Sequence, residues 1–335
     1  MLDLENNNQI NNDACPNCYL CGSSGELLYQ KLQDCLFGAP GEWNLKKCPN
    51  SECGLVWLDP MPVEEDIAKA YQTYYTHEID NSQKSFIRLI LSNIYNTASI
   101  VPWYLLDLKA QEVQLNTMYL ANTRTGKLLD VGCGSGKFLN NMRLTGWEVE
   151  GVDFDPKAVE LARTKYSINA HLGSLESIRF ADNSFDAITM SHVVEHVFNP
   201  VALLQECYRI LKPGGKLIAL TPNINSWGHQ KFKNNWRGLE PPRHFHLFSQ
   251  ITLRKCASKA GFNKNYTCTL SVRSLYWFSA SYDIQKFKKW KSKKKENEIN
   301  LLKSLQSLSD YYLACILSKM NHDLGEELIL IAEKK

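Results

Sequence analysis

The second half of the chain changes its hydrophobic pattern at regular intervals. Short runs of branched apolar residues predict strands, at residues 127–131, 147–153, 184–191 and 214–222. Between these runs, apolar residues recur at helical spacing and predict helices, at residues 136–146, 156–166 and 200–211. Pro156 stands at the first turn of the second helix, where its missing N–H group is tolerated. Strands that alternate with helices of this length are typical of βαβ units and a parallel sheet.

The remaining patterns predict the domain organisation. Beyond the alternating elements we expect a helix, two strands and a Lys-rich helical insertion, at residues 248–262, 266–272, 326–334 and about 274–322. Four parts follow from this, a disordered Asn-rich tail, a cysteine-rich module, a helical connector and an α/β domain, at residues 1–14, 15–62, 63–121 and 122–335.

Composition limits the class of protein without naming it. The chain has 335 residues, of which 44% are hydrophobic and 22% charged, as in ordinary globular proteins. Its formal net charge of +3 is too small to indicate a nucleic-acid partner. The N-terminus, MLDLENNNQINND, lacks the features of a secretory signal, and no apolar run reaches the length of a membrane span. We therefore expect a soluble, cytoplasmic protein whose eleven cysteines bind metal or are buried thiols.

The stretch LLDVGCGSG ends the first predicted strand in a glycine turn. Gly132, Gly134 and Gly136 follow the spacing G-x-G-x-G, whereas a dinucleotide site usually has G-x-G-x-x-G. Asp130 beside this turn would repel a diphosphate, but it suits an ammonium group. The next strand ends in Asp153, where a carboxylate can accept hydrogen bonds from both hydroxyls of a ribose. S-adenosylmethionine combines an ammonium, a sulfonium and a ribose, and it has no phosphate.

With these motifs the sequence resembles the class I S-adenosylmethionine-dependent methyltransferases, over residues 125–265 and the last strand. LLDVGCGSG, GVDFD, FDAITMSHVVEH and ILKPGGKLIALTPN occur in that family's order and spacing, closest to its ubiquinone-type and glycan-type enzymes for small molecules. The resemblance implies a seven-stranded, mostly parallel Rossmann-like sheet. It also implies which residues bind the cofactor. The methionine part would be held by Asp130, Gly132, Gly134 and Gly136, the ribose by Asp153, and the adenine by Ser174 and Leu175. Ser174 departs from the family, which often has Asp at this position.

Two histidine clusters follow the fourth and fifth predicted strands, on the ligand side of the sheet. In SHVVEHV, His192 and His196 are four positions apart and would share one face of a helix. In GLEPPRHFHLFS, His244 and His246 alternate and could face a substrate, or the loop could pack over the sheet edge. A histidine whose pKa is near neutrality is the usual general base for an oxygen nucleophile. The candidate catalytic residues are therefore His192, His196 and His244.

The first histidine cluster also raises the question of a metal. Some ubiquinone-type relatives have Glu at the first position of this motif and Glu-His at the last two, and they bind magnesium there. This chain keeps Glu195 and His196 but has His192 in the first position. We therefore prefer a structural hydrogen bond to metal binding for His196.

The N-terminal cysteines are spaced like the ligands of a zinc ribbon. CPNCYLCG and KKCPNSECG form two short cysteine turns, and a glycine follows both Cys21 and Cys53. Tetrahedral zinc takes four thiolates from two such turns, so we expect a structural zinc ion held by Cys18, Cys21, Cys48 and Cys53. Cys15 could replace Cys21, because the Cys15-x-x-Cys18 spacing is equally good. The spacing from Cys48 to Cys53 is wider than usual, and buried thiols without metal are the alternative.

The predicted function is methyl transfer from S-adenosylmethionine to a small molecule or to a glycan or lipid-linked precursor. An RNA methyltransferase that grips RNA with its ribbon is an alternative, but the balanced charge and the lack of an Asn-Pro-Pro-Tyr-like motif argue against it. A non-catalytic binding module and a dinucleotide oxidoreductase are disfavoured by the intact glycines, their spacing and Asp153. KFKKWKSKKK could contact RNA or an anionic membrane, and FIRLILSNIYNTASIVPWYLL could cover a lipid-linked substrate. We favour a solvated helix face for the first and a helix packed on the core for the second.

Overall fold

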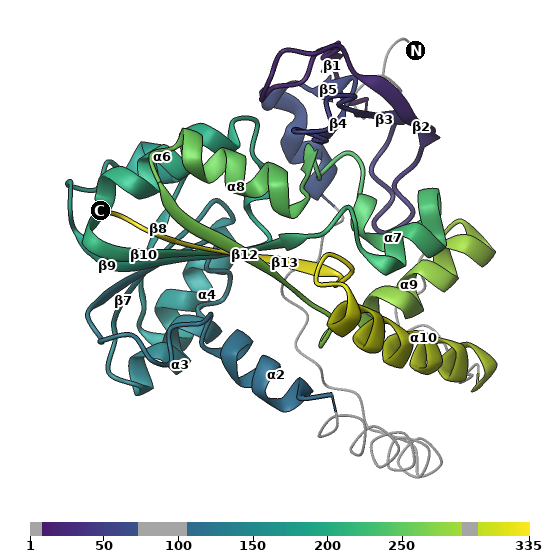
Figure 1. Cartoon of the computed structure of the whole chain (residues 1–335). Coiled ribbons are helices and arrows are strands. Elements are labelled where there is room, and N and C mark those ends of the chain that lie inside the picture. The colour runs from purple at the N-terminus through teal and green to yellow at the C-terminus, as the bar shows by residue number, and fades with distance from the viewer. Residues whose placement is uncertain (1–8, 73–105, 290–300) are drawn as a thin grey trace.

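A computed structural model describes residues 9–72, 106–289 and 301–335 of the chain (Figure 1). One seven-stranded sheet crosses the molecule, formed by β6 (Lys127–Val131), β7 (Glu148–Asp153), β8 (Asn169–Leu172), β9 (Phe185–Ser191), β10 (Leu211–Pro222), β12 (Lys264–Leu270) and β13 (Glu327–Glu333). Its strand order is β12-β13-β10-β9-β6-β7-β8. The strands from β10 to β8 are parallel, and β13 is antiparallel to both β10 and β12. The predicted α/β fold with a seven-stranded, mostly parallel sheet is confirmed.

The chain order reverses at β6, because β7 and β8 extend the sheet one way and β9 and β10 the other. Ligands of such sheets bind at the carboxyl ends of the strands beside this point. Asp153 ends β7 and Ser191 ends β9, so the segments that follow them meet at this edge. β13 runs in the opposite direction, and its first residue, Glu327, pairs with Pro222 at the end of β10. Glu327 therefore reaches the same edge.

Helices cover both faces of the sheet (Figure 1). The α-helices of the described residues are α2 (Leu108–Asn116), α3 (Lys137–Leu144), α4 (Pro156–Tyr166), α5 (Leu175–Ile178), α6 (Pro200–Ile210), α7 (Trp227–Phe232), α8 (Gln250–Lys259), α9 (Ser274–Phe287) and α10 (Leu301–Met320). Of these, α7, α9 and α10 pack on one another. Leu139 of α3 and Val159 of α4 belong to one hydrophobic core, while Leu204 of α6 and Leu253 of α8 belong to a second core. Helices α9 and α10 are the predicted insertion before the last strand.

The cysteine-rich module builds a second, four-stranded sheet with the order β11-β4-β3-β2. Its strands are β2 (Glu26–Leu32), β3 (Trp43–Lys47), β4 (Val56–Leu58) and β11 (His246–Leu247). Strand β11 comes from the segment between β10 and α8, residues 223–249, which we call the β10–α8 segment. Trp57 of β4 also shares a buried core with Leu253 of α8. The module predicted at residues 15–62 is thus joined to the α/β domain by a shared sheet and a shared core.

The remaining elements are short. They are β1 (Asn12–Asp13), β5 (Met61–Pro62) and the 3-10 helices η2 (Glu64–Tyr71), η3 (Val194–His196), η4 (Lys233–Asn235) and η5 (Arg237–Leu239). Strand β1 pairs with β5, and the Asn11 N–H group donates a hydrogen bond to Asp66 Oδ2 over 2.8 Å. The predicted disordered tail at residues 1–14 is therefore wrong from residue 9 onward, because these contacts order it.

Two predicted surface segments fall largely outside the described residues. The apolar stretch FIRLILSNIYNTASIVPWYLL is described only at its last residue, and the basic run KFKKWKSKKK only at residues 286–289. Within the described ranges, no helix has both the length and the apolar character that a membrane span requires.

Candidate active site and cysteine cluster

The glycine turn after β6 is shaped for close approach of a ligand. Gly132, Gly134 and Gly136 have φ values of 74°, 51° and 76°, in the left-handed region that favours glycine. A Cβ atom on Gly132 would lie 2.5 Å from Val193 Cγ2, so a larger residue does not fit there. A Cβ atom on Gly134 would meet nothing within 4 Å. The backbone at Gly134 therefore faces open space beside the end of the strand.

Asp153 ties this turn to the end of β7. Its Oδ2 accepts a hydrogen bond from the Gly134 N–H group over 2.8 Å, and its Oδ1 accepts one from the Asp155 N–H group over 2.9 Å. A carboxylate oxygen can accept more than one hydrogen bond, so the hydroxyls of a ligand can still bind here. Phe154, the next residue, is 64% exposed, and its ring lies edge-on to Tyr71 at 5.6 Å. Ribose recognition at this position fits the geometry.

Asp130 lies within β6 and is buried behind the turn. Thr189 Oγ1 donates a hydrogen bond to Asp130 Oδ1 over 2.6 Å. Burial raises the pKa of Asp130 to about 7, and the charge of Asp153 adds to this, whereas the bond from Thr189 opposes it. A cation bound at the turn would favour the ionised carboxylate. The pair of acids is therefore suited to a positively charged ligand.

The two residues predicted for adenine follow β8. The Gly173 N–H group donates to the Asp153 carbonyl over 3.0 Å, which brings this turn beside the ribose position. Ser174 is exposed and caps α5 by accepting a hydrogen bond from the Ser177 N–H group. Leu175 is buried in the second core, so its side chain is turned away from solvent. Ser174 is thus the better placed of the two.

His192 is held between two carboxylates. Its Nδ1 lies 3.0 Å from Glu195 Oε1 and its Nε2 lies 3.0 Å from Glu327 Oε1. Burial lowers the pKa of His192, but the hydrogen bonds to Glu195 and Glu327 outweigh this and raise it to about 10. An imidazolium cannot accept a proton, so this arrangement argues against His192 as the general base at neutral pH.

His196 and His244 are neutral histidines in contact with each other. Their ring centroids are 4.7 Å apart. Nδ1 of His196 lies 3.0 Å from both the Arg243 carbonyl and the Tyr71 hydroxyl, and Nδ1 of His244 lies 2.7 Å from the Gly238 carbonyl. Because a carbonyl can only accept, each Nδ1 carries the proton and each Nε2 carries a lone pair. Burial lowers the pKa of His196 and lowers that of His244 to about 3, so both stay neutral.

The predicted common face of His244 and His246 is not formed as a substrate surface. His246 lies in β11 opposite Trp57, and its Nε2 donates to the Phe198 carbonyl over 3.2 Å. Burial lowers the pKa of His246 to about 4. Its role is structural, within the sheet shared with the cysteine-rich module.

Glu195, His196 and His244 each bring one possible metal-ligand atom within 4.8 Å of the others. Both oxygens of Glu195 already accept hydrogen bonds, from His192 and from Thr221 Oγ1 over 2.9 Å. The geometry therefore favours a hydrogen-bonded cluster over a metal site, in line with the preferred role of His196.

Sequence reasoning missed Glu327. Its Oε1 contacts His192, and its Oε2 is buried with no hydrogen-bond partner among the described residues. Glu326 and Glu327 precede a wholly apolar strand, LILIA, and two acids at the start of a predicted core strand were the available signal. The sequence also assigned no role to Arg243, which lies in the loop GLEPPRHFHLFS, or to its partner Asp34, which lies in no recognised motif.

Four cysteines from two turns of the N-terminal module converge, and three of them, Cys18, Cys48 and Cys53, share a buried core with Leu253 of α8. The Sγ atoms of Cys18 and Cys53 are 3.6 Å apart and those of Cys21 and Cys48 are 3.4 Å apart, and all four lie within 4.8 Å. Zinc–sulfur bonds of about 2.3 Å in a tetrahedron place sulfur atoms roughly 3.8 Å apart. Cys15 is outside this cluster, with its carbonyl accepting a hydrogen bond from Trp57 Nε1 over 2.7 Å. The four thiols predicted as ligands fit a structural zinc ion.

Comparison with known proteins agrees with this geometry. Residues 105–266 match the model of a family described as a methyltransferase domain. This part of the chain is therefore similar to methyltransferase domains. Over 103 residues the chain is 37% identical to "Ubiquinone biosynthesis O-methyltransferase" of Xanthomonas oryzae pv. oryzae (strain PXO99A), which covers 29% of this chain and 43% of that protein. The protein of the same name from Cereibacter sphaeroides (strain ATCC 17029 / ATH 2.4.9) is 36% identical over 104 residues, 30% of this chain and 42% of its own.

This chain thus spans less than half the length of these curated relatives. A solved structure from Thermotoga maritima, described as a S-adenosylmethionine-dependent methyltransferase and possible histamine N-methyltransferase, is 20% identical. It covers 71% of this chain and 96% of its own, with a TM-score of 0.45.

Metal analysis tests the cysteine cluster. We expect about one zinc ion per chain, since four thiolates complete one tetrahedral site. Cys48→Ala should lose the metal and lower the unfolding midpoint, because the site contributes folding free energy. Cys15→Ala is the matched control and should keep the metal. Zinc-free wild-type protein, or loss of zinc only in the control, would contradict the assignment.

Histidine NMR tests the state of His192. Its folded pKa of about 10 is above the unfolded value of about 6.5. The protonated imidazole therefore stabilises the fold fully below about pH 6.5, and this contribution is lost as the pH rises through about 10. We expect its imidazole signals to stay constant from pH 6 to 9, and the stability gap between wild type and His192→Gln to shrink towards pH 10. An imidazole that titrates near pH 6.5 would overturn this reading.

Proposed function

We propose that the chain transfers the methyl group of S-adenosylmethionine to a small molecule, with a glycan or lipid-linked precursor among the acceptors to be tested. One observation supports this proposal most directly. The backbone at Gly134 is open and lies between two acids, Asp130 and Asp153, where the strand order reverses. The names of the curated relatives, which are O-methyltransferases of ubiquinone biosynthesis, support a small acceptor.

Each part of the cofactor has a matching group in this site. Asp153 would accept hydrogen bonds from the ribose hydroxyls, and the exposed ring of Phe154 lies beside it. The turn at Gly134 would hold the methionine part by its backbone, while Asp130 balances the ammonium charge. When bound, the sulfonium supplies an electrophilic methyl group whose transfer depends largely on positioning and on exclusion of water.

The acceptor would lie on the other side of the turn, near the histidines. His244 is neutral, and its protonated Nδ1 leaves Nε2 able to take a proton from an acceptor hydroxyl. The His192 imidazolium holds Glu195 and Glu327 in place, and Glu327 Oε2 offers an acceptor for a hydroxyl or amine hydrogen. His244 is our candidate general base because its Nε2 keeps a lone pair, although burial holds its pKa at about 3, below the near-neutral value that suits this role, and His192 is a fixed positive charge.

Calorimetry with S-adenosylhomocysteine tests the cofactor assignment. Asp153→Asn should weaken binding by about 1.5–3 kcal/mol, because it removes a charged acceptor. Asp155→Asn is the matched control: Asp155 accepts from the Lys157 N–H group as the cap of α4, and Asn caps equally well. NAD should not bind. Equal affinity of Asp153→Asn and the control would remove the ribose assignment.

Turnover tests the base. A metabolite screen for release of S-adenosylhomocysteine would first supply an acceptor. With it, His244→Ala should lower kcat by about 10²–10⁴-fold with cofactor affinity preserved. His171→Gln is the control, since His171 pairs with Glu150 and stands apart from this cluster. If His244→Ala turns over like the control, the transfer does not need this base.

A further inference from the structure

Asp34 is buried where the N-terminal module meets the β10–α8 segment. Its side chain has no exposed surface. Oδ2 lies 2.8 Å from Arg243 Nη1 and Oδ1 lies 3.0 Å from Arg243 Nη2, which is a bidentate ion pair. The same carboxylate accepts hydrogen bonds from the N–H groups of Leu36, Phe37 and Ala39, over 2.9, 3.1 and 2.8 Å. Asp34 thus fixes its own loop and one guanidinium together.

Arg243 joins three segments that are far apart in the chain. Besides Asp34, its Nη1 donates to the Ala70 carbonyl at the end of η2 over 3.0 Å, and its Nε donates to Glu240 Oε1 over 3.0 Å. Its guanidinium also lies over the Phe37 ring, 4.7 Å from the centroid. A planar guanidinium with partners on several sides has one orientation.

This orientation extends to the histidines through the backbone. The carbonyl of Arg243 accepts the Nδ1–H of His196 over 3.0 Å. The N–H groups of Arg243 and His244 both donate to the Glu240 carbonyl, over 3.0 and 3.1 Å. Glu240 Oε2 lies 3.9 Å from His244 Nε2 and accepts from Arg237 Nη1 over 2.6 Å. Moving Arg243 would therefore move both neutral histidines.

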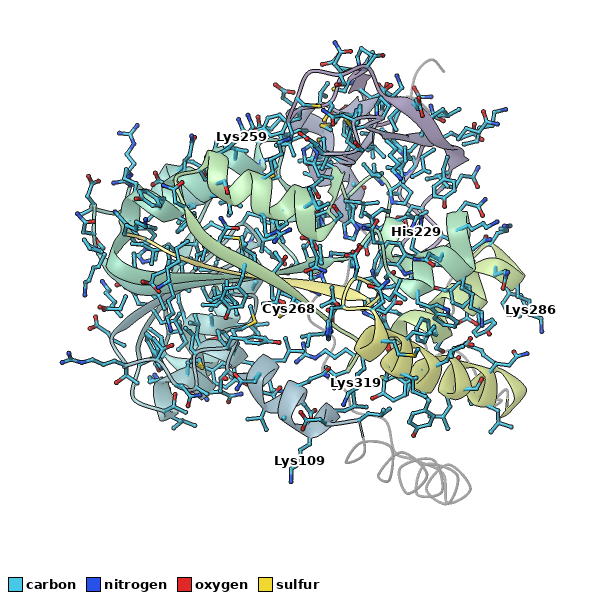
Figure 2. The ribbon with its side chains drawn as sticks, viewed as in Figure 1. Lys109, His229, Lys259, Cys268, Lys286 and Lys319 are labelled. Atoms are coloured by element: carbon cyan, nitrogen blue, oxygen red, sulfur yellow. The ribbon has the colours of Figure 1, made fainter. Side chains whose placement is uncertain are left out.

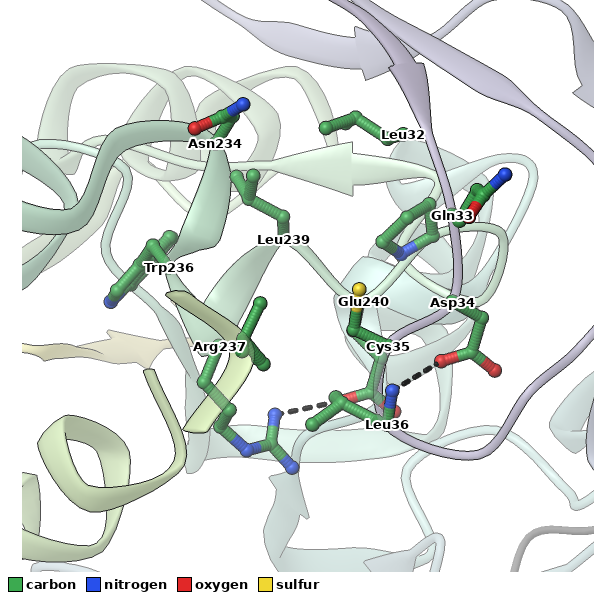
Figure 3. A pocket seen from close by; sticks show the side chains of 12 residues that line it. Leu32, Gln33, Asp34, Cys35, Leu36, Asn234, Trp236, Arg237, Leu239 and Glu240 are labelled. Carbon is green, nitrogen blue, oxygen red and sulfur yellow. Dashed lines mark hydrogen bonds and ion pairs between the residues drawn. The ribbon is translucent and has the colours of Figure 1, made fainter. Parts of the chain in front are cut away.

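Contacts of η2, which ends at Tyr71, and of the module reach the same region. Tyr71 lies 3.0 Å from His196 Nδ1, and the Tyr29 hydroxyl lies 2.9 Å from Nε2 of His229, which Figure 2 labels near the module. Figure 3 shows a pocket lined by residues of both parts, including Asp34 and Glu240. The cysteine-rich module is in this way one wall of the region that holds His196 and His244.

We propose that Asp34 is a positioning residue of the acceptor site, which acts through Arg243 to set the places of His196 and His244. That this site binds the methyl acceptor rests on the proposed function, whereas the positioning of the histidines does not. An ion pair is not needed here for stability alone, because apolar replacements of buried pairs are often as stable. The ion pair instead fixes the orientation of the histidine rings, and a nitrogen that accepts a proton must be correctly oriented.

Histidine NMR of the full chain tests the positioning without an acceptor. In Asp34→Asn, the imidazole signals of His196 and His244 should shift, while those of His171 and His322, which lie elsewhere, should not. Hydrogen exchange should rise in residues 237–247 and stay unchanged in β6. Asp182→Asn, which removes one of the two acidic partners of Arg209 at the surface, is the matched control and should leave all these signals in place. Arg243→Lys keeps the charge, loses the fork and should shift the same two histidines.

Turnover then tests the consequence. Asp34→Asn should lower kcat by roughly 10²-fold, the cost of misplacing a reacting group by about 1 Å, with S-adenosylhomocysteine affinity as in wild type. Unmoved His196 and His244 signals in a folded Asp34→Asn would overturn the proposal, as would unchanged kcat. If Asp34→Asn does not fold, unmoved signals in Arg243→Lys overturn it. Wild-type protein that binds no S-adenosylhomocysteine would instead remove the proposed function, and the NMR comparison would still decide the positioning.

Discussion

The buried guanidinium of Arg243 holds distant segments of this structure together. A buried cation is tolerated only when its N–H groups meet acceptors. Here the acceptors come from Asp34, Glu240 and the Ala70 carbonyl, so three distant segments must come together for the charge to be buried at all. Strand β11, which pairs with β4 in the shared sheet, begins three residues after Arg243. The N-terminal module and the α/β domain therefore complete one another's fold.

The carboxylates of the site fall into two groups with different partners. At the glycine turn the Gly134 N–H group donates to Asp153 and the Thr189 hydroxyl donates to Asp130, and burial raises the pKa of Asp130. Burial raises the pKa of Glu195, but the hydrogen bond from His192 and the charge of that imidazolium together hold it at about 2. A cationic ligand is thus favoured at the turn beside Asp130 and Asp153, whereas Glu195 and Glu327 already have the His192 imidazolium between them. In the proposed function, these two groups of charges separate the side of the methyl donor, at the glycine turn, from the side of the methyl acceptor, at the histidines.

The sequence was sufficient for features that depend on local pattern. Strand β6 and helix α4 could be predicted because their signals are local in the sequence. These signals are the spacing of the apolar residues and, for α4, the start at Asp155 and Pro156. The four cysteines were predicted from turn spacing. By contrast, Asp34 and Arg243 are 209 positions apart and neither belongs to a motif, so nothing local pairs them. The positive charge of His192 could not be predicted from the sequence either. It depends on Glu327, which is 135 positions away in the chain and begins the antiparallel strand β13.

That antiparallel strand explains why His192 has an unusual backbone. His192 has φ of 55°, in the left-handed region that costs a non-glycine residue roughly 1–2 kcal/mol. Its N–H group still donates to the Leu220 carbonyl, so the residue remains tied to β10 while its side chain turns along the sheet edge. The turn places the two ring nitrogens between Glu195, three residues later, and Glu327, at the start of β13. Two charged hydrogen bonds, each contributing about 1.5–3 kcal/mol, are enough to offset the strain. A glycine would relieve the backbone here but would leave two buried carboxylates without their cation, and this is the physical reason for histidine at the end of β9.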